Sequence, residues 1–226
     1  MVTSTPTRGD RTRAAVVEAA TDAFTESGYT AATMADVASR AGVSEATVFL
    51  HFGSKAGLLM AVMRRYYDEL AATCEQVAES TSDPVERLRA LTLHWAVRLR
   101  DDWSLTANFA QQGRFHTDPE LSEQFMDCNR QITRIYGGVV ADLQQRGVLD
   151  ASLPTRVIRD VIFGTLEHLV ISHATVGRPE DVEKAADALV QLLLHGAVGS
   201  TKPRPKSSRD RLARIEEKLD DLLARA

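Results

Sequence analysis

A short segment after Gly42 carries side chains that could read the edges of DNA base pairs. Thr47 could hydrogen-bond a base or a phosphate, and Ala46 or Leu50 could touch the methyl group of a thymine. Glu45 could accept a hydrogen bond from cytosine N4, or it could be a solvated charge that the helix dipole favours at a helix start. The candidate DNA-contacting residues of this segment are Ser44, Glu45, Ala46, Thr47, Phe49, Leu50 and His51.

Two short predicted helices between Thr33 and Lys55 would position these side chains. Apolar residues recur in both at helical spacing, and Gly42 falls where the chain must turn sharply with a positive φ angle. Thr33 with Asp36 fits a capping box for the first helix, and Ser44 can cap the second. Two helices joined by a tight glycine-containing turn form a helix-turn-helix, whose second helix can enter the major groove. The turn by itself would also fit an ordinary helical hairpin in a bundle.

The longer pattern from residue 12 to residue 60 resembles the DNA-binding domain of the TetR family of bacterial regulators. The resemblance implies an all-α fold, in which an N-terminal three-helix helix-turn-helix domain precedes a helical bundle for ligand binding and dimerisation. It also implies that Thr33, His51 and Lys55 contact the DNA backbone, although His51 could instead satisfy a local hydrogen bond. The matching residues are Val16, Ala19, Ala20, Phe24, Gly28, Tyr29, Met34, Val37, Ala38, Ala41, Gly42, Val43, Ser44, Thr47, Val48, Phe49, His51, Phe52, Lys55, Leu58 and Leu59.

Phe49 departs from the family pattern, which often has a tyrosine at this position. A phosphate contact through a phenolic hydroxyl is therefore absent. We expect the ring to pack more than to bind, although it belongs to the candidate DNA-contacting helix.

The N-terminal domain has little positive charge to attract DNA. Residues 1 to 60 hold five basic and six acidic side chains, and the whole chain has a net charge of -4. Binding must therefore depend on where the few cations and helix N-termini lie. Arg11 and Arg13 follow a small, polar N-terminal arm and could reach a phosphate or a minor groove, or they could belong to a solvated tail.

The predicted helices divide the chain into an arm, two domains and a tail. A helix from Ser54 to about Glu79 has no breaker and would join the two domains as a rigid rod. The amphipathic C-terminal helix is short for an isolated helix, so it could dock on the body, pair with its twin or fray. The expected divisions are a flexible arm at 1–10, the DNA-binding domain at 11–56, the ligand-binding and dimerisation domain at 57–198, a linker at 199–208 and the C-terminal helix at 209–226.

The last two helices of the bundle, near 154–176 and 180–198, carry more apolar surface than one small bundle needs. The economical explanation is a homodimer in which both helices pack against their symmetry mates, as the family pattern also implies. Two recognition helices would then enter successive major grooves about 34–36 Å apart on a near-palindromic operator.

Aromatic and soft side chains in the bundle could line an apolar cavity, although such residues belong more often to a core. The C-terminal part also resembles fatty-acid-responsive TetR members, which implies a long-chain acyl-CoA or a related apolar effector. Arg98, Arg100 or Arg114 could pair with its anionic group, or each could be a solvated arginine. The candidate ligand-binding residues are Met63, Tyr67, Trp95, Trp103, Phe109, Phe115, Phe125, Tyr136 and Phe163.

Composition and motifs argue against several other classes. Hydrophobic residues make up 44% of the 226 and charged residues 26%, which fits a folded protein and not a disordered one. No apolar run approaches the ~20 residues needed to span a bilayer, no signal peptide is present, and a cytoplasmic location with reduced Cys74 and Cys128 is expected. Catalytic motifs and metal-ligand spacings are missing, so we expect no enzymatic activity, no metal and no cofactor.

These observations predict a ligand-responsive transcriptional regulator, and a repressor that a small apolar effector releases from a palindromic operator is the preferred form. A helical carrier dimer that binds an apolar ligand but no DNA is the alternative, which the weak basicity and Glu45 leave open. An all-α enzyme would be a third class, but no residue set suggests one.

Overall fold

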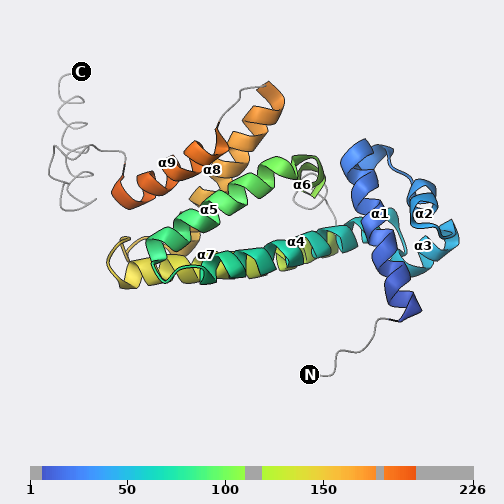
Figure 1. The fold of residues 1–226 in the computed structure, drawn as a ribbon, viewed down its shortest axis with the longest axis horizontal. Coiled ribbons are helices and arrows are strands. Elements are labelled where there is room, and N and C mark those ends of the chain that lie inside the picture. The colour runs from blue at the N-terminus through green and yellow to red at the C-terminus, as the bar shows by residue number, and fades with distance from the viewer. Residues whose placement is uncertain (1–6, 110–118, 177–180, 197–226) are drawn as a thin grey trace, which may run out of the picture.

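The computed structural model describes residues 7–109, 119–176 and 181–196, and the regular structure in these residues is helical (Figure 1). Three helices form a unit at one end of an elongated molecule, and the other described helices form a bundle (Figure 1). This arrangement confirms the predicted all-α fold with an N-terminal helix-turn-helix. The helices are α1 (Arg8–Ala31), α2 (Met34–Ala41), α3 (Glu45–Phe52), α4 (Lys55–Glu79), α5 (Pro84–Asp101), α6 (Trp103–Phe109), α7 (Pro119–Gln145), α8 (Thr155–Val176) and α9 (Val182–His195).

Local hydrogen bonds set the ends of the two short helices. The Thr33 hydroxyl accepts from the Asp36 N–H at 3.0 Å, and the Asp36 carboxylate accepts from the Thr33 N–H at 3.1 Å, so the predicted capping box is present. Gly42 ends α2 in the left-handed conformation with φ 66° and ψ 33°, as the turn requires. Ser44 then caps α3 by accepting from the Thr47 N–H at 3.1 Å.

The first helix begins earlier than its apolar pattern suggests. Thr7 and Asp10 form a capping box that starts α1 at Arg8, so Arg8 to Asp10, expected in the arm, lie in its first turn. Gly28 interrupts α1 with φ 76° and ψ 158°. Tyr29 follows this break and is thereby directed towards the start of α4, where its ring meets a lysine described below.

The long helix α4 runs without a break from the N-terminal unit into the bundle (Figure 1). A buried stripe that includes Leu58, Met63, Leu70 and Cys74 faces the core, and α7 and α5 pack against it. The predicted rod is therefore a feature of the fold. Among the described residues, no single helix is long and apolar enough to cross a membrane; α3 and α4 would pass only if joined across their 68° bend.

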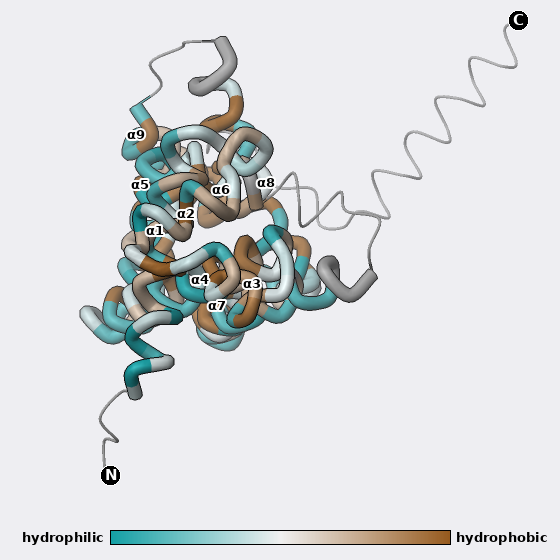
Figure 2. The backbone as a smooth tube through the Cα atoms, turned by 90° about the vertical axis from the view of Figure 1, so that its right-hand side faces the viewer, coloured by the Kyte–Doolittle hydropathy of each residue, from teal (hydrophilic) through white to brown (hydrophobic). Residues whose placement is uncertain are grey.

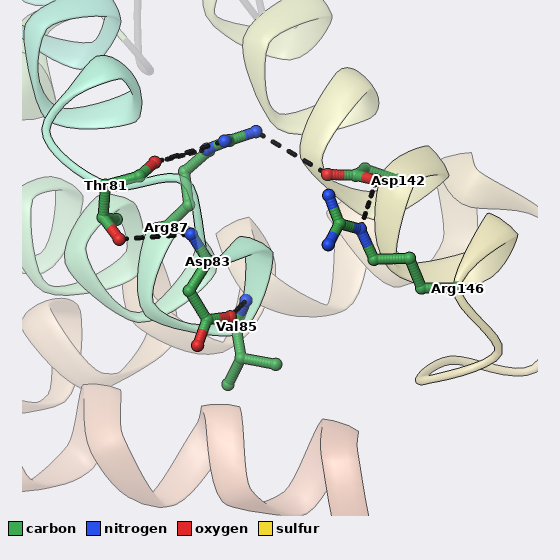
Figure 3. Close-up of polar contacts among 6 residues, drawn as sticks. All are labelled: Thr81, Asp83, Val85, Arg87, Asp142 and Arg146. Atoms are coloured by element: carbon green, nitrogen blue, oxygen red, sulfur yellow. Dashed lines mark hydrogen bonds and ion pairs between the residues drawn. The ribbon is translucent and has the colours of Figure 1, made fainter.

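A polar network fixes the end of α4 that lies far from the N-terminal unit (Figure 3). Asp83 caps α5 by accepting from the Val85 N–H at 2.9 Å. The Arg87 guanidinium donates to the Thr81 carbonyl at 3.2 Å and lies 3.8 Å from the Asp142 carboxylate on α7. The loop between α4 and α5 is thus attached to the last turns of α7, and the distal end of the rod is held to the bundle.

Candidate DNA interface and effector cleft

The helix α3 belongs to the N-terminal unit, which faces the viewer in Figure 2. One face of this helix is exposed to solvent. Glu45, Ala46, Phe49 and Leu50 are exposed on it, while Val48 on the opposite side is fully buried and anchors the helix. Leu50 is 83% exposed, and Phe49, which we expected to pack, is still 45% exposed. The face therefore offers three apolar side chains and one carboxylate to a binding partner.

The hydroxyl groups near the start of α3 are already engaged with one another. The Ser44 and Thr47 hydroxyls lie 2.8 Å apart in a hydrogen bond. A hydroxyl has one donor and two acceptor sites, so each could still reach a base or a phosphate. The Thr33 hydroxyl is exposed and serves the cap of α2, and the half-buried His51 ring lies 6.1 Å from the Phe52 ring.

Lys55 is held in place by the end of α1. Its Nζ donates to the Thr30 carbonyl at 3.2 Å and lies 4.6 Å from the centroid of the Tyr29 ring. Partial burial lowers the pKa of this ammonium group from its usual value. The sequence matched Lys55 and the Gly28-Tyr29 pair to one family pattern, but the contact between them was not anticipated because it joins residues distant in the chain.

The arginines of the N-terminal unit differ in the groups that they contact. The Arg13 guanidinium lies 5.2 Å from the centroid of the Phe52 ring, so this cation ties α1 to the end of α3. Arg11 is exposed in the same turn of α1. Arg40 instead pairs with Glu26 at 2.8 Å, and the hydrogen bond from Arg40 lowers the pKa of that carboxyl. Arg13 and Lys55 are therefore better candidates for phosphate contacts than Arg40 is, and the contact expected for Arg11 stays a prediction.

A half-open cleft of about 470 Å³ lies between α7 and α8 in the bundle. Its volume is in the usual range for small-molecule sites. The rim carries Arg130, which pairs with Asp127 at 2.7 Å, and Arg159, which pairs with Asp160 at 2.8 Å. The cleft is lined by Met126, Asn129, Arg130, Thr133, Arg159, Asp160, Phe163, Gly164 and Glu167.

One predicted ligand-binding residue, Phe163, lines this cleft, and two others support it from behind. The Phe163 ring lies 4.9 Å from the Trp95 ring and 4.9 Å from the Tyr136 ring, centroid to centroid. Tyr136 is fully buried, and its hydroxyl donates to the Leu91 carbonyl at 2.6 Å. These three aromatic residues therefore connect the cleft to α5 and α7.

The other described candidates gather near α4 and α6. Tyr67 and Phe109 are buried there with ring centroids 6.3 Å apart, and Met63 is buried on the same side of the fold. Trp103 is half-buried at the start of α6. The candidates thus form two groups and not one wall. Phe115 and the side chain of Phe125 lie outside the described part of the chain.

Two of the arginines that we considered for an anionic group do not line this cleft. Arg98 pairs with Asp102 at 2.8 Å, and Arg100 pairs with Glu183 of α9 at 2.8 Å. Arg114 lies outside the described residues. The arginines at the cleft, which sequence reasoning missed, became visible only once α7 and α8 were placed together.

The bundle also meets the N-terminal unit away from the rod. The short helix α6 packs against α1, and a second cleft of about 230 Å³ lies where α1, α4 and α6 approach one another. An ion pair between Arg65 and Glu69 at 2.8 Å borders it. The N-terminal unit is therefore attached to the bundle at two places, the rod and the contact between α1 and α6.

Two family models match adjacent parts of the chain. One, described as bacterial regulatory proteins of the tetR family, matches residues 16–62. The other, described as the C-terminal region of YsiA-like protein, matches residues 63–196. The two matches meet within α4, and together they cover the N-terminal unit and the bundle.

Several known proteins are similar over most of their length. The transcriptional activator FasR of Mycolicibacterium smegmatis is 30% identical over 190 residues, covering 83% of each chain. The fatty acid metabolism regulator protein of Bacillus subtilis is 22% identical over 182 residues, covering 80% of this chain and 93% of its own. The fold is shared with the regulator FadR from Bacillus subtilis in complex with stearoyl-CoA, with a TM-score of 0.71 at 22% identity over 82% of this chain and 99% of that one. These relatives are transcriptional regulators and not enzymes. The chain belongs to the TetR family of bacterial regulatory proteins.

Proposed function

We propose that the chain is a homodimeric repressor that an amphipathic effector of the fatty acyl-CoA class releases from a palindromic operator. The observation that carries this proposal is the cleft between α7 and α8, because it combines an apolar floor with guanidinium groups at its rim. An acyl chain would lie against Phe163 and Met126, and a phosphate would lie near Arg130 and Arg159.

The polar groups of the cleft leave capacity for such a ligand. A guanidinium has five N–H donors, so Arg130 and Arg159 can each hold a carboxylate and still donate to a phosphate. The Asn129 Oδ1 atom is buried with no hydrogen-bond partner among the described atoms. A donor on a bound ligand would satisfy this oxygen, which would otherwise be unfavourably desolvated.

The solved relatives support this effector class. One is FadR bound to stearoyl-CoA, and another is AibR in complex with isovaleryl coenzyme A and operator DNA. The curated relatives include an activator, FasR, and a repressor, KstR2, so the direction of regulation is part of the proposal. We favour repression because a ligand against α7 would displace α4, which packs along it, and so change the separation of two recognition helices.

The dimer would form through α8 and α9, as the apolar pattern predicted. Val157, Val161 and Ile171 are exposed along one side of α8, and Leu192 is exposed on α9. Large apolar side chains at helical spacing on a solvent-facing surface are typical of an interface between subunits. A two-fold dimer would present two copies of α3 to one duplex.

The test uses fluorescence anisotropy of the full-length protein with its own upstream DNA. Palmitoyl-CoA should weaken DNA binding about 5–150-fold, the range expected for an allosteric coupling of 1–3 kcal/mol, and free coenzyme A should not. Thr133→Trp, which fills the cleft, should remove the response while DNA binding persists. Arg134→Trp, an exposed neighbour on α7 that does not line the cleft, is the matched control and should respond as the wild type does.

Two results would contradict the proposal in different ways. DNA binding that acyl-CoA leaves unchanged would reject the effector class and keep the regulator. A protein that binds acyl-CoA but retards no DNA at any salt concentration would be the carrier dimer considered above.

A further inference from the structure

The solvent-facing side of α3 lacks the groups that usually read guanine. All residues of this helix are described, and its exposed face consists of Glu45, Ala46, Phe49 and Leu50, with no lysine or arginine. Guanine is read mainly by two donors on its O6 and N7 atoms, which none of these side chains supplies. Adenine is read by side-chain amides, and no asparagine or glutamine lies on the face either.

Three of the four exposed side chains can make only apolar contacts. The one apolar group that a base pair shows in the major groove is the C5-methyl group of thymine. Leu50 is the most exposed of the three at 83%, and Phe49 lies one position before it, so both project beyond the buried Val48. The apolar part of the face therefore fits thymine methyl groups better than any other base feature.

We infer that α3 selects its operator through thymine methyl groups, with Leu50 as the main contact and Phe49 as the second. Sequence choice then comes from apolar contacts, and affinity comes from the cations around them. Arg13 stacks on the end of α3 and Lys55 starts the next helix, so both lie beside this face and can meet phosphates. This inference rests on operator binding by the chain.

A duplex is a better occupant of the apolar face than a protein partner. The cations Arg13 and Lys55 are held over the rings of Phe52 at the end of α3 and Tyr29 near the end of α1. A phosphate backbone on both sides of a groove matches an apolar centre with cations next to it.

The experiment compares thymine with deoxyuridine, which lacks only the methyl group. DNA sites are first selected from a random library with the full-length protein, and each thymine of the selected half-site is then replaced singly by deoxyuridine. Replacement at a contacted position should weaken binding about fourfold per methyl group, which corresponds to ~0.8 kcal/mol. A symmetric replacement in both half-sites should weaken it about 15-fold.

Two variants separate this role from general DNA affinity. Leu50→Ala should bind thymine and deoxyuridine sites nearly equally, with an unchanged dependence on salt. Lys55→Ala should bind all sites more weakly, with a reduced salt dependence, and should keep the preference for thymine. Leu50 is almost fully exposed, so its replacement should leave the thermal melting temperature unchanged.

Each outcome has one meaning. Selected sites in which no deoxyuridine replacement weakens binding would overturn the inference and leave the regulator intact. A preference for thymine that persists in both Leu50→Ala and Phe49→Ala would do the same. Failure to select any DNA would overturn the inference and operator binding together.

Discussion

At the scale of single residues, the position of Lys55 depends on a ring from another helix. Tyr29 lies under the ammonium group at 4.6 Å and packs on Phe24, so its ring fixes where this charge can meet a phosphate. We expect Tyr29→Ala to weaken DNA binding about 2–5-fold, because a partly exposed cation–π contact contributes ~0.5–1 kcal/mol. Tyr29→Phe keeps the ring and should bind as the wild type does. Anisotropy titrations checked against thermal melts would measure both, and an equal loss in the two variants would assign the effect to the hydroxyl.

His94 makes the stability of the bundle sensitive to mild acid. Its Nε2 atom lies 2.9 Å from the Thr73 hydroxyl on α4, and burial together with the Arg98 charge lowers its pKa. The unfolded state therefore takes up this proton at a higher pH than the folded state does. The contribution is fully present above pH 6.5, the ordinary histidine value, and is lost as the pH falls below it. Urea denaturation at pH 7.5 and 5.0 should show a larger loss for the wild type than for His94→Gln, and equal losses would contradict this assignment.

The residues that sequence reasoning placed correctly are those that act on near neighbours. Thr33 and Ser44 were assigned as caps because a cap depends on the next two or three residues alone. The contact of Lys55 with Tyr29 and the arginines of the cleft depend on helices that are distant in the chain. No local pattern specifies such pairs. Arg98 and Arg100 do not line the cleft and pair with Asp102 and Glu183.

At the scale of helices, two glycines should respond in opposite ways to the same substitution. Gly42 has φ 66° at the turn between α2 and α3, a conformation that strains any side chain. Gly138 lies inside the continuous helix α7. Among the described residues, no atom lies within 4 Å of the position that a Cβ would take there. Close packing against another described helix is therefore not the reason for a glycine at this position. Gly42→Ala should destabilise the protein by about 1 kcal/mol, and Gly138→Ala should stabilise it by up to ~1 kcal/mol. Chemical denaturation measures both, and a stabilising Gly42→Ala would mean that the turn tolerates another geometry.

The helices themselves were predictable because an apolar pattern that repeats over many residues specifies a helix whatever the helix packs against. The rod α4 lies where its pattern placed it. The start of α1 was wrong by one turn because the cap formed by Thr7 and Asp10 precedes the apolar stripe. The ends of helices depend on such single hydrogen bonds, whereas their middles depend on many residues.

At the scale of the whole molecule, the two ends of α4 are attached to the bundle in different ways. The Arg87 and Asp142 contact holds the distal end to α7, while the proximal end carries the N-terminal unit, which also meets the bundle through α6 (Figures 1 and 3). A displacement of α7 would therefore move α4, which packs along it and carries the N-terminal unit with α3. This geometry explains how a cleft far from α3 could control DNA binding, and the order of helices along the chain could not have revealed it.

The proposed dimer would connect these two scales, because two copies of α3 would read a palindromic operator. Val161 on α8 is 40% exposed and Val148 after α7 is 41% exposed, so the two differ mainly in which surface they occupy. Val161→Arg would bury an unpaired charge in the proposed interface, which destabilises such contacts by about 3–5 kcal/mol, and it should raise the dimer dissociation constant about 100-fold or more. Val148→Arg should leave the dimer intact. Analytical ultracentrifugation measures the two, and DNA binding should fall only for Val161→Arg. If Val161→Arg remained dimeric, the interface would have to lie away from α8, and the two copies of α3 would then need a different route to a common duplex.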